Sequence, residues 1–123
     1  MGKLVVDMSK LRLVLLEDSR PAYLRLLGQT LGYDEESGVL RINNLVPAYG
    51  NETYIPDLQV DMSKIVSRMP LNNPALEPGA IVNVEVAFSG LQSPILALDI
   101  YEVKDGSIVN NRMDLLMQMD DVH

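Results

Sequence analysis

The sequence contains no cysteine and no tryptophan, and its single histidine, His123, is the last of 123 residues. The absence of cysteine excludes disulfides, thiolate zinc sites and cysteine nucleophiles, and it fits a reducing intracellular compartment. A histidine at the end of a chain has little structure around it to position it as a general base. The side chains most often used in catalysis are therefore scarce.

Other chemical signatures are missing as well. The sequence has no phosphate-cradling glycine loop, no nucleophile elbow and no metal-ligand spacing. Acidic residues cluster at 34–36 and 120–121, but charge runs in a turn or at a terminus are far more often solvated than bound to a metal. We therefore expect a protein that is not an enzyme and that carries no cofactor or metal.

Long apolar runs are also absent. No stretch approaches the roughly 20 residues that cross a bilayer, and Asp7 follows the start too early for a secretory signal. Gly2 is not followed by the serine or threonine that a myristoylation signal uses. The sequence predicts no contact with a membrane.

What the chain does have is acid and apolar surface. It carries 17 acidic against 10 basic residues, a net charge of −7. Because phosphate affinity comes from Lys and Arg, this balance argues against tight nucleic-acid binding by the chain alone. Hydrophobic residues make up 47% of the sequence, seven of them methionine, which is more than an isolated domain requires and favours a protein partner.

The length predicts one domain over residues 1–123. Residues 1–20 are apolar but irregular and are interpreted as an N-terminal arm or edge strand, with a strand possible at 11–16. Pro21 breaks this segment, since a residue before proline is pushed out of helical geometry. The domain proper is expected to begin there.

A long strand is predicted over residues 22–33. Leu24 and Leu26 would share one face, and Tyr23 and Arg25 the other. Gly28 interrupts this pattern, and an interior glycine usually marks a bulge or a sharp bend where a barrel closes.

The next elements alternate between strand and turn. Residues 34–38 form a hairpin loop with Gly38 at its end, and 39–45 return as the partner strand. Residues 54–62 form a third strand. The period then changes to that of a short amphipathic helix over 62–69, capped by Asp61 or Ser63 and ended by Pro70.

Two more strands complete the pattern. In residues 81–88 the even positions are all apolar: Val82, Val84, Val86 and Phe88. In residues 95–103, Leu96, Leu98 and Ile100 alternate with Ala97, Asp99 and Tyr101, as expected of a strand with the first three facing inward.

The last segment, residues 110–122, is predicted to be a helix whose apolar residues cover more than half of its circumference. They are Met113, Leu115, Leu116, Met117, Met119 and Val122. This is too much apolar surface for a helix that packs only on its own domain. We expect it to be a protein interface, with Met113, Leu115, Leu116, Met117 and Met119 in contact with a partner. The alternative is a helix that merely covers one mouth of the barrel.

The order of elements predicts an all-β protein: a five-stranded OB-fold barrel with a short helix between strands 3 and 4, followed by a C-terminal helix. Residues 21–122 resemble the smallest subunit of the telomere-capping CST complex, of the fungal type, and more distantly the small subunit of replication protein A. The resemblance rests on Tyr23 to Gly28 with its return hairpin, on Gly79 to Phe88, on Leu96 to Val103 and on the terminal Met113 to Met119.

This resemblance implies a non-catalytic nuclear subunit at telomeric chromatin. In both families the terminal helix pairs with the middle OB-fold subunit, and methionine side chains suit such an interface. Single-stranded DNA would be bound weakly or through the complex. The best grouping for such contacts is Arg25, Arg41 and Tyr54, because stacking and basic charge bind single strands; for most of the tyrosines a structural role is the stronger expectation.

Three functions stay open at this point. The first is the telomere-capping subunit, and the second is the small subunit of replication protein A. The third is an acidic protein-interaction barrel with no connection to nucleic acid, since fold alone is a poor guide to function.

Overall fold

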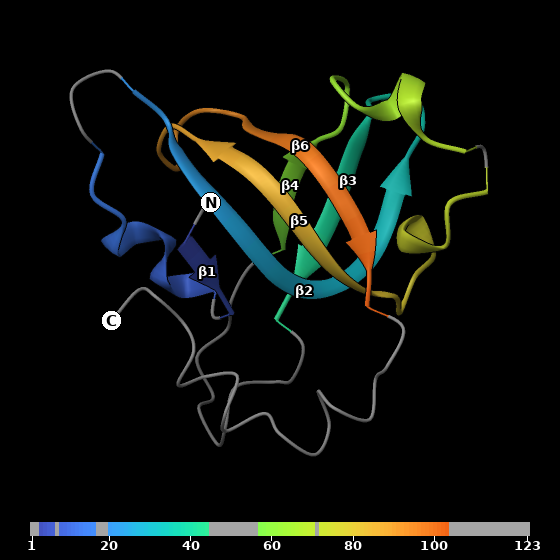
Figure 1. Ribbon diagram of the computed structural model, residues 1–123, viewed down its shortest axis with the longest axis horizontal. Coiled ribbons are helices and arrows are strands. Elements are labelled where there is room, and N and C mark those ends of the chain that lie inside the picture. Colours follow the sequence, from blue (N-terminus) through green and yellow to red (C-terminus); the bar gives the residue numbers. More distant parts are fainter. Residues whose placement is uncertain (1–2, 7, 17–19, 45–56, 71, 104–123) are drawn as a thin grey trace, which may run out of the picture.

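The computed structural model describes residues 3–6, 8–16, 20–44, 57–70 and 72–103 (Figure 1). In these ranges it contains six strands and three 3-10 helices. The strands are β1 (Lys3–Val5), β2 (Ala22–Asp34), β3 (Val39–Asn43), β4 (Leu58–Asp61), β5 (Ile81–Phe88) and β6 (Ile95–Glu102). The helices are η1 (Met8–Leu13), η2 (Val66–Arg68) and η3 (Pro74–Leu76).

Five of the strands form a closed ring. The sheet order is β1-β2-β3-β4-β6-β5, and β5 pairs back with β2. Closure is possible because β2 is long: its first part pairs with β5 from Ala22 to Gln29, and its last part pairs with β3 from Gln29 onward. Gln29 is thus the residue at which β2 passes from one neighbour to the other.

The sixth strand, β1, corrects the expected number of five. It lies parallel to β2, with Lys3 opposite Leu24 and Val5 opposite Leu26. One reading of the sequence expected a strand at 11–16, but these residues do not form one. Residues 11–13 belong to η1, which buries Met8 and Leu11 in the core.

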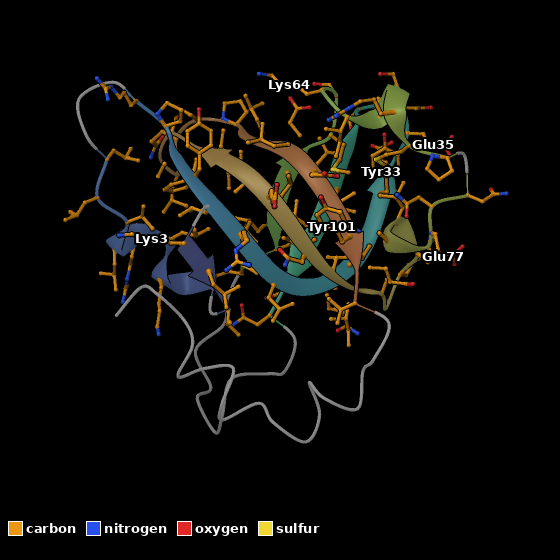
Figure 2. The ribbon with its side chains drawn as sticks, in the orientation of Figure 1. Lys3, Tyr33, Glu35, Lys64, Glu77 and Tyr101 are labelled. Atoms are coloured by element: carbon orange, nitrogen blue, oxygen red, sulfur yellow. The ribbon has the colours of Figure 1, made fainter. Side chains whose placement is uncertain are left out.

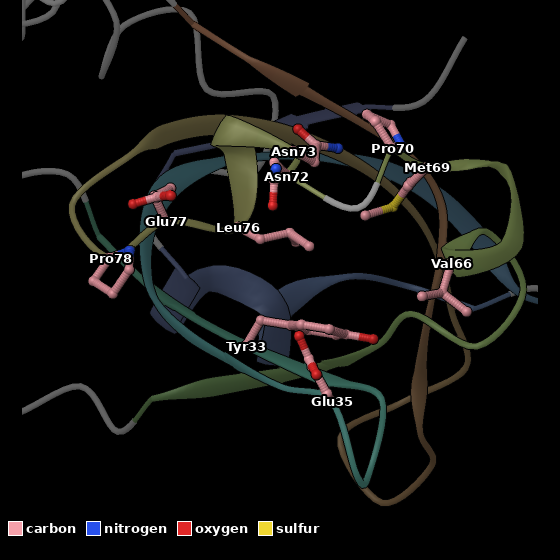
Figure 3. Close-up of a pocket in the computed structure, with 10 residues that line it drawn as sticks. All are labelled: Tyr33, Glu35, Val66, Met69, Pro70, Asn72, Asn73, Leu76, Glu77 and Pro78. Atoms are coloured by element: carbon pink, nitrogen blue, oxygen red, sulfur yellow. The ribbon is translucent and has the colours of Figure 1, made fainter.

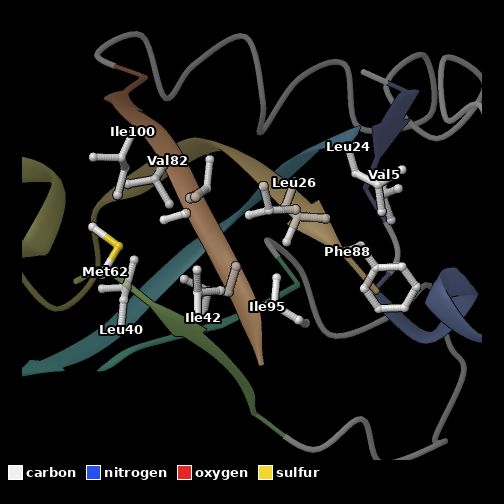
Figure 4. Close-up of a cluster of buried hydrophobic side chains, with 14 of the residues drawn as sticks. Val5, Leu24, Leu26, Leu40, Ile42, Met62, Val82, Phe88, Ile95 and Ile100 are labelled. Carbon is white, nitrogen blue, oxygen red and sulfur yellow. The ribbon is translucent and has the colours of Figure 1, made fainter. Parts of the chain in front are cut away.

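The core lies inside the ring (Figure 4). It is built from the inward positions of all six strands together with side chains from η1, η3 and the segment after β4. The alternation predicted for residues 81–88 is confirmed, since Val82, Val84, Val86 and Phe88 are buried. Leu24 and Leu26 are buried as expected, while Tyr23 on the opposite face is 61% exposed.

The short helix expected at 62–69 is only the three-residue η2. Met62 still donates its backbone N–H to Gly38 at 2.8 Å, so the strand pairing of β4 effectively continues to this residue. The Val66 N–H reaches back four residues to Met62 O at 3.0 Å, but the bonds after it are of the tighter 3-10 type, such as Arg68 N–H to Ile65 O at 2.9 Å. Asp61 does cap the turn, accepting from the Ser63 N–H at 2.8 Å.

The inward set predicted for residues 95–103 was partly wrong. Ile95, Ala97 and Ile100 are buried, whereas Leu96 and Leu98 are only half-buried. The cause is a register shift: Val86 faces Ala97 but Glu85 faces Asp99, which leaves Leu98 as an extra residue. Such a bulge reverses the facing of every residue beyond it.

Gly28 does not lie at the bulge of β2, because the register shift in this strand lies between Thr30 and Gly32. A Cβ at Gly28 would lie only 2.7 Å from the backbone oxygen of Asn43 and 3.0 Å from Met8 Cε. Glycine is therefore needed here for the close approach of β3 and η1.

Candidate interaction surfaces

Most of the site residues expected from sequence lie outside the described ranges. This holds for the terminal-helix positions Met113, Leu115, Leu116, Met117 and Met119, and for Tyr54. Arg25 and Arg41 are described, and the strand register keeps them apart. Arg25 faces Glu85, whereas Arg41 faces Gly32, which is seven residues further along β2, or roughly 23 Å of extended strand.

Arg41 is held by an acidic neighbour. Its Nη1 lies 3.6 Å from Asp57 Oδ2, with the two side chains 52% and 37% exposed. Asn43 Nδ2 also donates to Asp57 Oδ1 at 3.4 Å. A nucleic-acid phosphate would have to compete with Asp57 for this guanidinium, although an exposed pair of this kind contributes at most about 1 kcal/mol.

The outer face of β2, β5 and β6 carries two acidic residues and one basic residue side by side. Arg25, Glu85 and Asp99 occupy one row across these strands. Next to that row, the Tyr101 hydroxyl donates to Asp99 Oδ2 at 2.7 Å. This hydrogen bond and the negative charge of Asp99 raise the pKa of Tyr101. Tyr101 is thus engaged with a carboxylate, which makes it a poor stacking platform for a polyanion.

An exposed apolar surface lies at one end of the molecule, where the chain leaves η1 and enters β2. Its members, called here the N-terminal surface, are Leu13, Leu15, Leu16, Tyr23 and Leu91. They are five of the seven large hydrophobic side chains exposed in the described part of the chain. Leu16 reaches the turn between β5 and β6, since a Cβ on Gly90 would lie 3.9 Å from its Cδ1. Apolar surface gathered in this way is typical of a protein-binding region.

The first part of the sequence is less acidic than the rest. Residues 3–33 contain five Lys and Arg against three Asp and Glu, whereas the remaining residues contain five against 14. The overall charge of −7 therefore hides a local excess of positive charge. Sequence reasoning counted the charges of the whole chain and missed this division.

The opposite end holds an open pocket of about 470 Å³, called here the end pocket (Figure 3). One wall is the end of the β2–β3 hairpin, and the other is the segment from η2 to the start of β5. Its apolar lining consists of Tyr33, Val66, Met69, Pro70, Leu76 and Pro78. Glu35 and Glu77 line it from the two walls, and Figure 2 places both with Tyr33 at this end.

The second wall of the end pocket is fastened to β2 by buried polar contacts. The Thr30 hydroxyl, fully buried, donates to the Ala75 carbonyl at 2.7 Å. The backbone N–H of Gly79 donates to Thr30 O at 2.8 Å. Asn73 caps η3 by accepting from the Ala75 N–H at 3.0 Å. The segment over 72–78 is therefore an ordered wall.

The hairpin wall is ordered by its own turn. Asp34 Oδ1 accepts from the Glu36 N–H at 3.0 Å, and Gly38 closes the turn with φ of 70°. The hydrogen bonds from Glu36 and from the Ser37 hydroxyl lower the pKa of Asp34. Asp34 is thus used within the turn, while the Glu35 side chain remains at the pocket.

Two negative findings apply to the described ranges. They contain no helix that is both long and apolar enough to cross a membrane. Within them, no three or more His, Cys, Asp or Glu side chains are grouped so that they could hold a metal ion.

Comparison with known proteins identifies relatives. Residues 1–114 match the family model of Ten1, described as a telomere-capping subunit of the CST complex. Telomere capping protein Ten1 from Saccharomyces pombe shares the fold with a TM-score of 0.60 at 14% identity, over 96% of each chain. No match was found among curated proteins.

Two structures of complexes are also similar to this chain. A chain of the S. pombe Stn1–Ten1 complex has a TM-score of 0.62 at 14% identity, over 96% of this chain and 90% of that one. A chain of the yeast Stn1 and Ten1 structure has a TM-score of 0.65 at 16% identity, over 98% and 92%. At these identities the similarity shows the fold alone.

Proposed function

This chain belongs to the Ten1 family of telomere-capping CST complex subunits, and from that premise we propose that it is a non-catalytic subunit of a complex that protects single-stranded chromosome ends in the nucleus. The observation that carries the proposal is the family match, which spans residues 1–114. Of the three functions left open by the sequence, this match favours the first.

The proposal includes the fold type. The closed ring β2-β3-β4-β6-β5 has the strand number and pairing of an OB-fold barrel. The segment that carries η2 and η3 stands between the third and fourth strands of this ring, where that fold has its helix. β1 is then an addition at the edge of the barrel.

The partner in this proposal is a larger OB-fold subunit of the Stn1 type. Two of the structures with the same fold come from Stn1–Ten1 complexes. The terminal segment 110–122 supplies the main contact through Met113, Leu115, Leu116, Met117 and Met119. Burial of such side chains, at about 25 cal/mol per Å² of apolar surface, is enough to hold a stable heterodimer.

The N-terminal surface is proposed as a second part of this interface. It concentrates exposed apolar side chains at one place, and Leu91 and Leu16 project there from two different segments.

Co-expression with the Stn1-type subunit tests the interface. Met113→Asp or Leu116→Asp should abolish co-purification, because a carboxylate would be buried without a partner, while the circular dichroism spectrum of the ring stays unchanged. Leu91→Asp should weaken binding by a smaller factor. Val66→Asp is the matched control for Leu91→Asp, since it puts the same carboxylate on an exposed apolar residue outside the N-terminal surface. Full binding by both terminal-helix variants would refute the interface.

DNA association is proposed to be weak, or to depend on the complex. Arg25 and Arg41 face Glu85 and Asp57 respectively, so neither can present isolated positive charge to phosphates. Arg25, Arg41 and Tyr54 remain the candidate contacts. Fluorescence anisotropy with a single-stranded telomeric oligonucleotide should give submicromolar affinity only for the complex; the same affinity for the isolated chain at physiological salt would contradict this.

A further inference from the structure

We propose that the end pocket is a docking site for a short peptide segment that places an arginine or lysine next to an apolar side chain. The inference rests on the pocket's own geometry and charge and is independent of the proposed telomeric function. It concerns the end of the molecule opposite the N-terminal surface.

The size and lining of the end pocket fit such a ligand. A volume of about 470 Å³ lies within the range of roughly 300–1,000 Å³ that ligand sites occupy. Tyr33, Met69 and Leu76 are only half-buried in the free chain, so an apolar side chain entering between the walls would remove them from water. Pro70 and Pro78 add rigid apolar contacts at the edges and lack backbone N–H groups that would need a partner.

The charge of the end pocket selects for a basic ligand. Glu35 and Glu77 line it from opposite walls, and neither carboxylate has a hydrogen-bond or ion-pair partner among the described residues. No Lys or Arg lines it. The nearest basic residue on η2, Arg68, is directed elsewhere, since its Nη2 donates to the Leu98 carbonyl at 3.1 Å.

Two other carboxylates near this end are already engaged. Asp34 accepts from the Glu36 N–H, and Asp61 from the Ser63 N–H at 2.8 Å. The hydrogen bonds from the Ser63 backbone and hydroxyl lower the pKa of Asp61, and Lys64 adds a smaller effect in the same direction. Glu36 does not line the pocket, so Glu35 and Glu77 are the two carboxylates that its lining offers to an incoming cation.

A peptide fits the pocket better than a free cation. The two carboxylates are on different walls with apolar side chains between them, so they do not form the close oxygen cluster that a divalent ion needs. A segment with alternating basic and apolar side chains can satisfy both walls at once. The walls are ordered in advance by the Thr30–Ala75 and Gly79–Thr30 hydrogen bonds, which reduces the entropic cost of binding.

The test is an NMR titration of the isotopically labelled full chain with three synthetic peptides of equal length. One alternates arginine and leucine, one glutamate and leucine, and one arginine and serine. The first should shift amide resonances at residues 33–36 and 66–79, and its affinity should fall as salt is added because the charges are exposed. The other two should bind at least about tenfold more weakly, since the glutamate–leucine peptide lacks the basic side chains and the arginine–serine peptide lacks the apolar side chains.

Variants separate the pocket from general charge. The double variant Glu35→Gln and Glu77→Gln should weaken the arginine–leucine peptide about three- to tenfold, and Leu76→Asp should weaken it further. The matched control, Glu85→Gln with Glu102→Gln, makes the same charge change on another face and should leave the affinity unchanged. Equal loss in the control, equal binding of the glutamate peptide, or the same shifts from spermine alone would overturn the proposal.

Discussion

The two ends of the ring are closed in different ways. At one end the six-residue η1 inserts Met8 and Leu11 into the core, and the Met8 N–H donates to Asn44 Oδ1 at 2.9 Å. At the other end η2 buries no residue and η3 buries only Ala75. The first end is sealed from within, whereas the second is covered by a loop that leaves the end pocket open.

The two covers also differ in what they leave accessible. The cover at the second end leaves a pocket lined by two glutamates and by no Lys or Arg. The cover at the first end contributes buried side chains to the core. The following experiments probe this difference in packing.

The largest expected effect is at the sealed end. Leu11→Ala should lower the free energy of unfolding by about 2–5 kcal/mol, because it leaves a cavity in the core. Val66→Ala at the open end is the control and should change it by no more than about 0.5 kcal/mol. Chemical denaturation of both variants measures the contrast, and equal losses would show that both ends contribute alike.

A smaller effect is expected from the wall of the end pocket. Thr30→Val keeps the shape of the side chain but leaves the buried Ala75 carbonyl without its donor, which should cost about 1–3 kcal/mol. Faster amide exchange at residues 75–79 should accompany it, and the peptide affinity should fall. Thr30→Ser retains the hydroxyl and should restore both the slow amide exchange at residues 75–79 and the peptide affinity. If exchange rises equally in η1, the wall is not an independent unit.

The smallest effect concerns the hairpin beside Glu35. In the folded chain the pKa of Asp34 lies below its ordinary value of 3.8. The unfolded chain therefore binds more protons at this group, and the ionised Asp34 stabilises the fold fully above about pH 3.8. This stabilisation is lost as the pH falls through the folded-state pKa. The stability difference between the natural chain and Asp34→Ala should therefore be full at neutral pH and vanish in strong acid, as measured by urea denaturation. A difference independent of pH would assign it to packing instead.

Local pattern predicted the strands where one face is buried throughout. The alternation over 81–88 fixed the facing of β5, and Gly38 with its acidic neighbours identified the hairpin correctly. The same reasoning failed for Leu96 and Leu98, because the bulge opposite Glu85 is a property of the strand pair and leaves no signature in either strand alone. It also failed for residues 62–69, where Met62 pairs with the hairpin and most of the hydrogen bonds that follow span three residues instead of the four of an α-helix.

The candidate sites show the same division. Arg25 and Arg41 were grouped by residue type, yet the register places them on separate stretches of β2. The end pocket could not be seen in advance, because its walls are far apart in the sequence and meet only when Thr30 binds the Ala75 carbonyl. The terminal helix 110–122 remains a prediction from sequence.

The sequence by itself determined the facing of β5, the position of the hairpin at 34–38 and that the chain is acidic, since these depend on residue type and on spacing between near neighbours. The tertiary structure decided that the strands close into a ring, that one end is sealed by η1 and that the other forms a cavity between two glutamates. Those features depend on pairing between residues distant in the chain. The free energy of such a pair depends on both residues and on their relative geometry, so the sequence around either residue alone does not predict it.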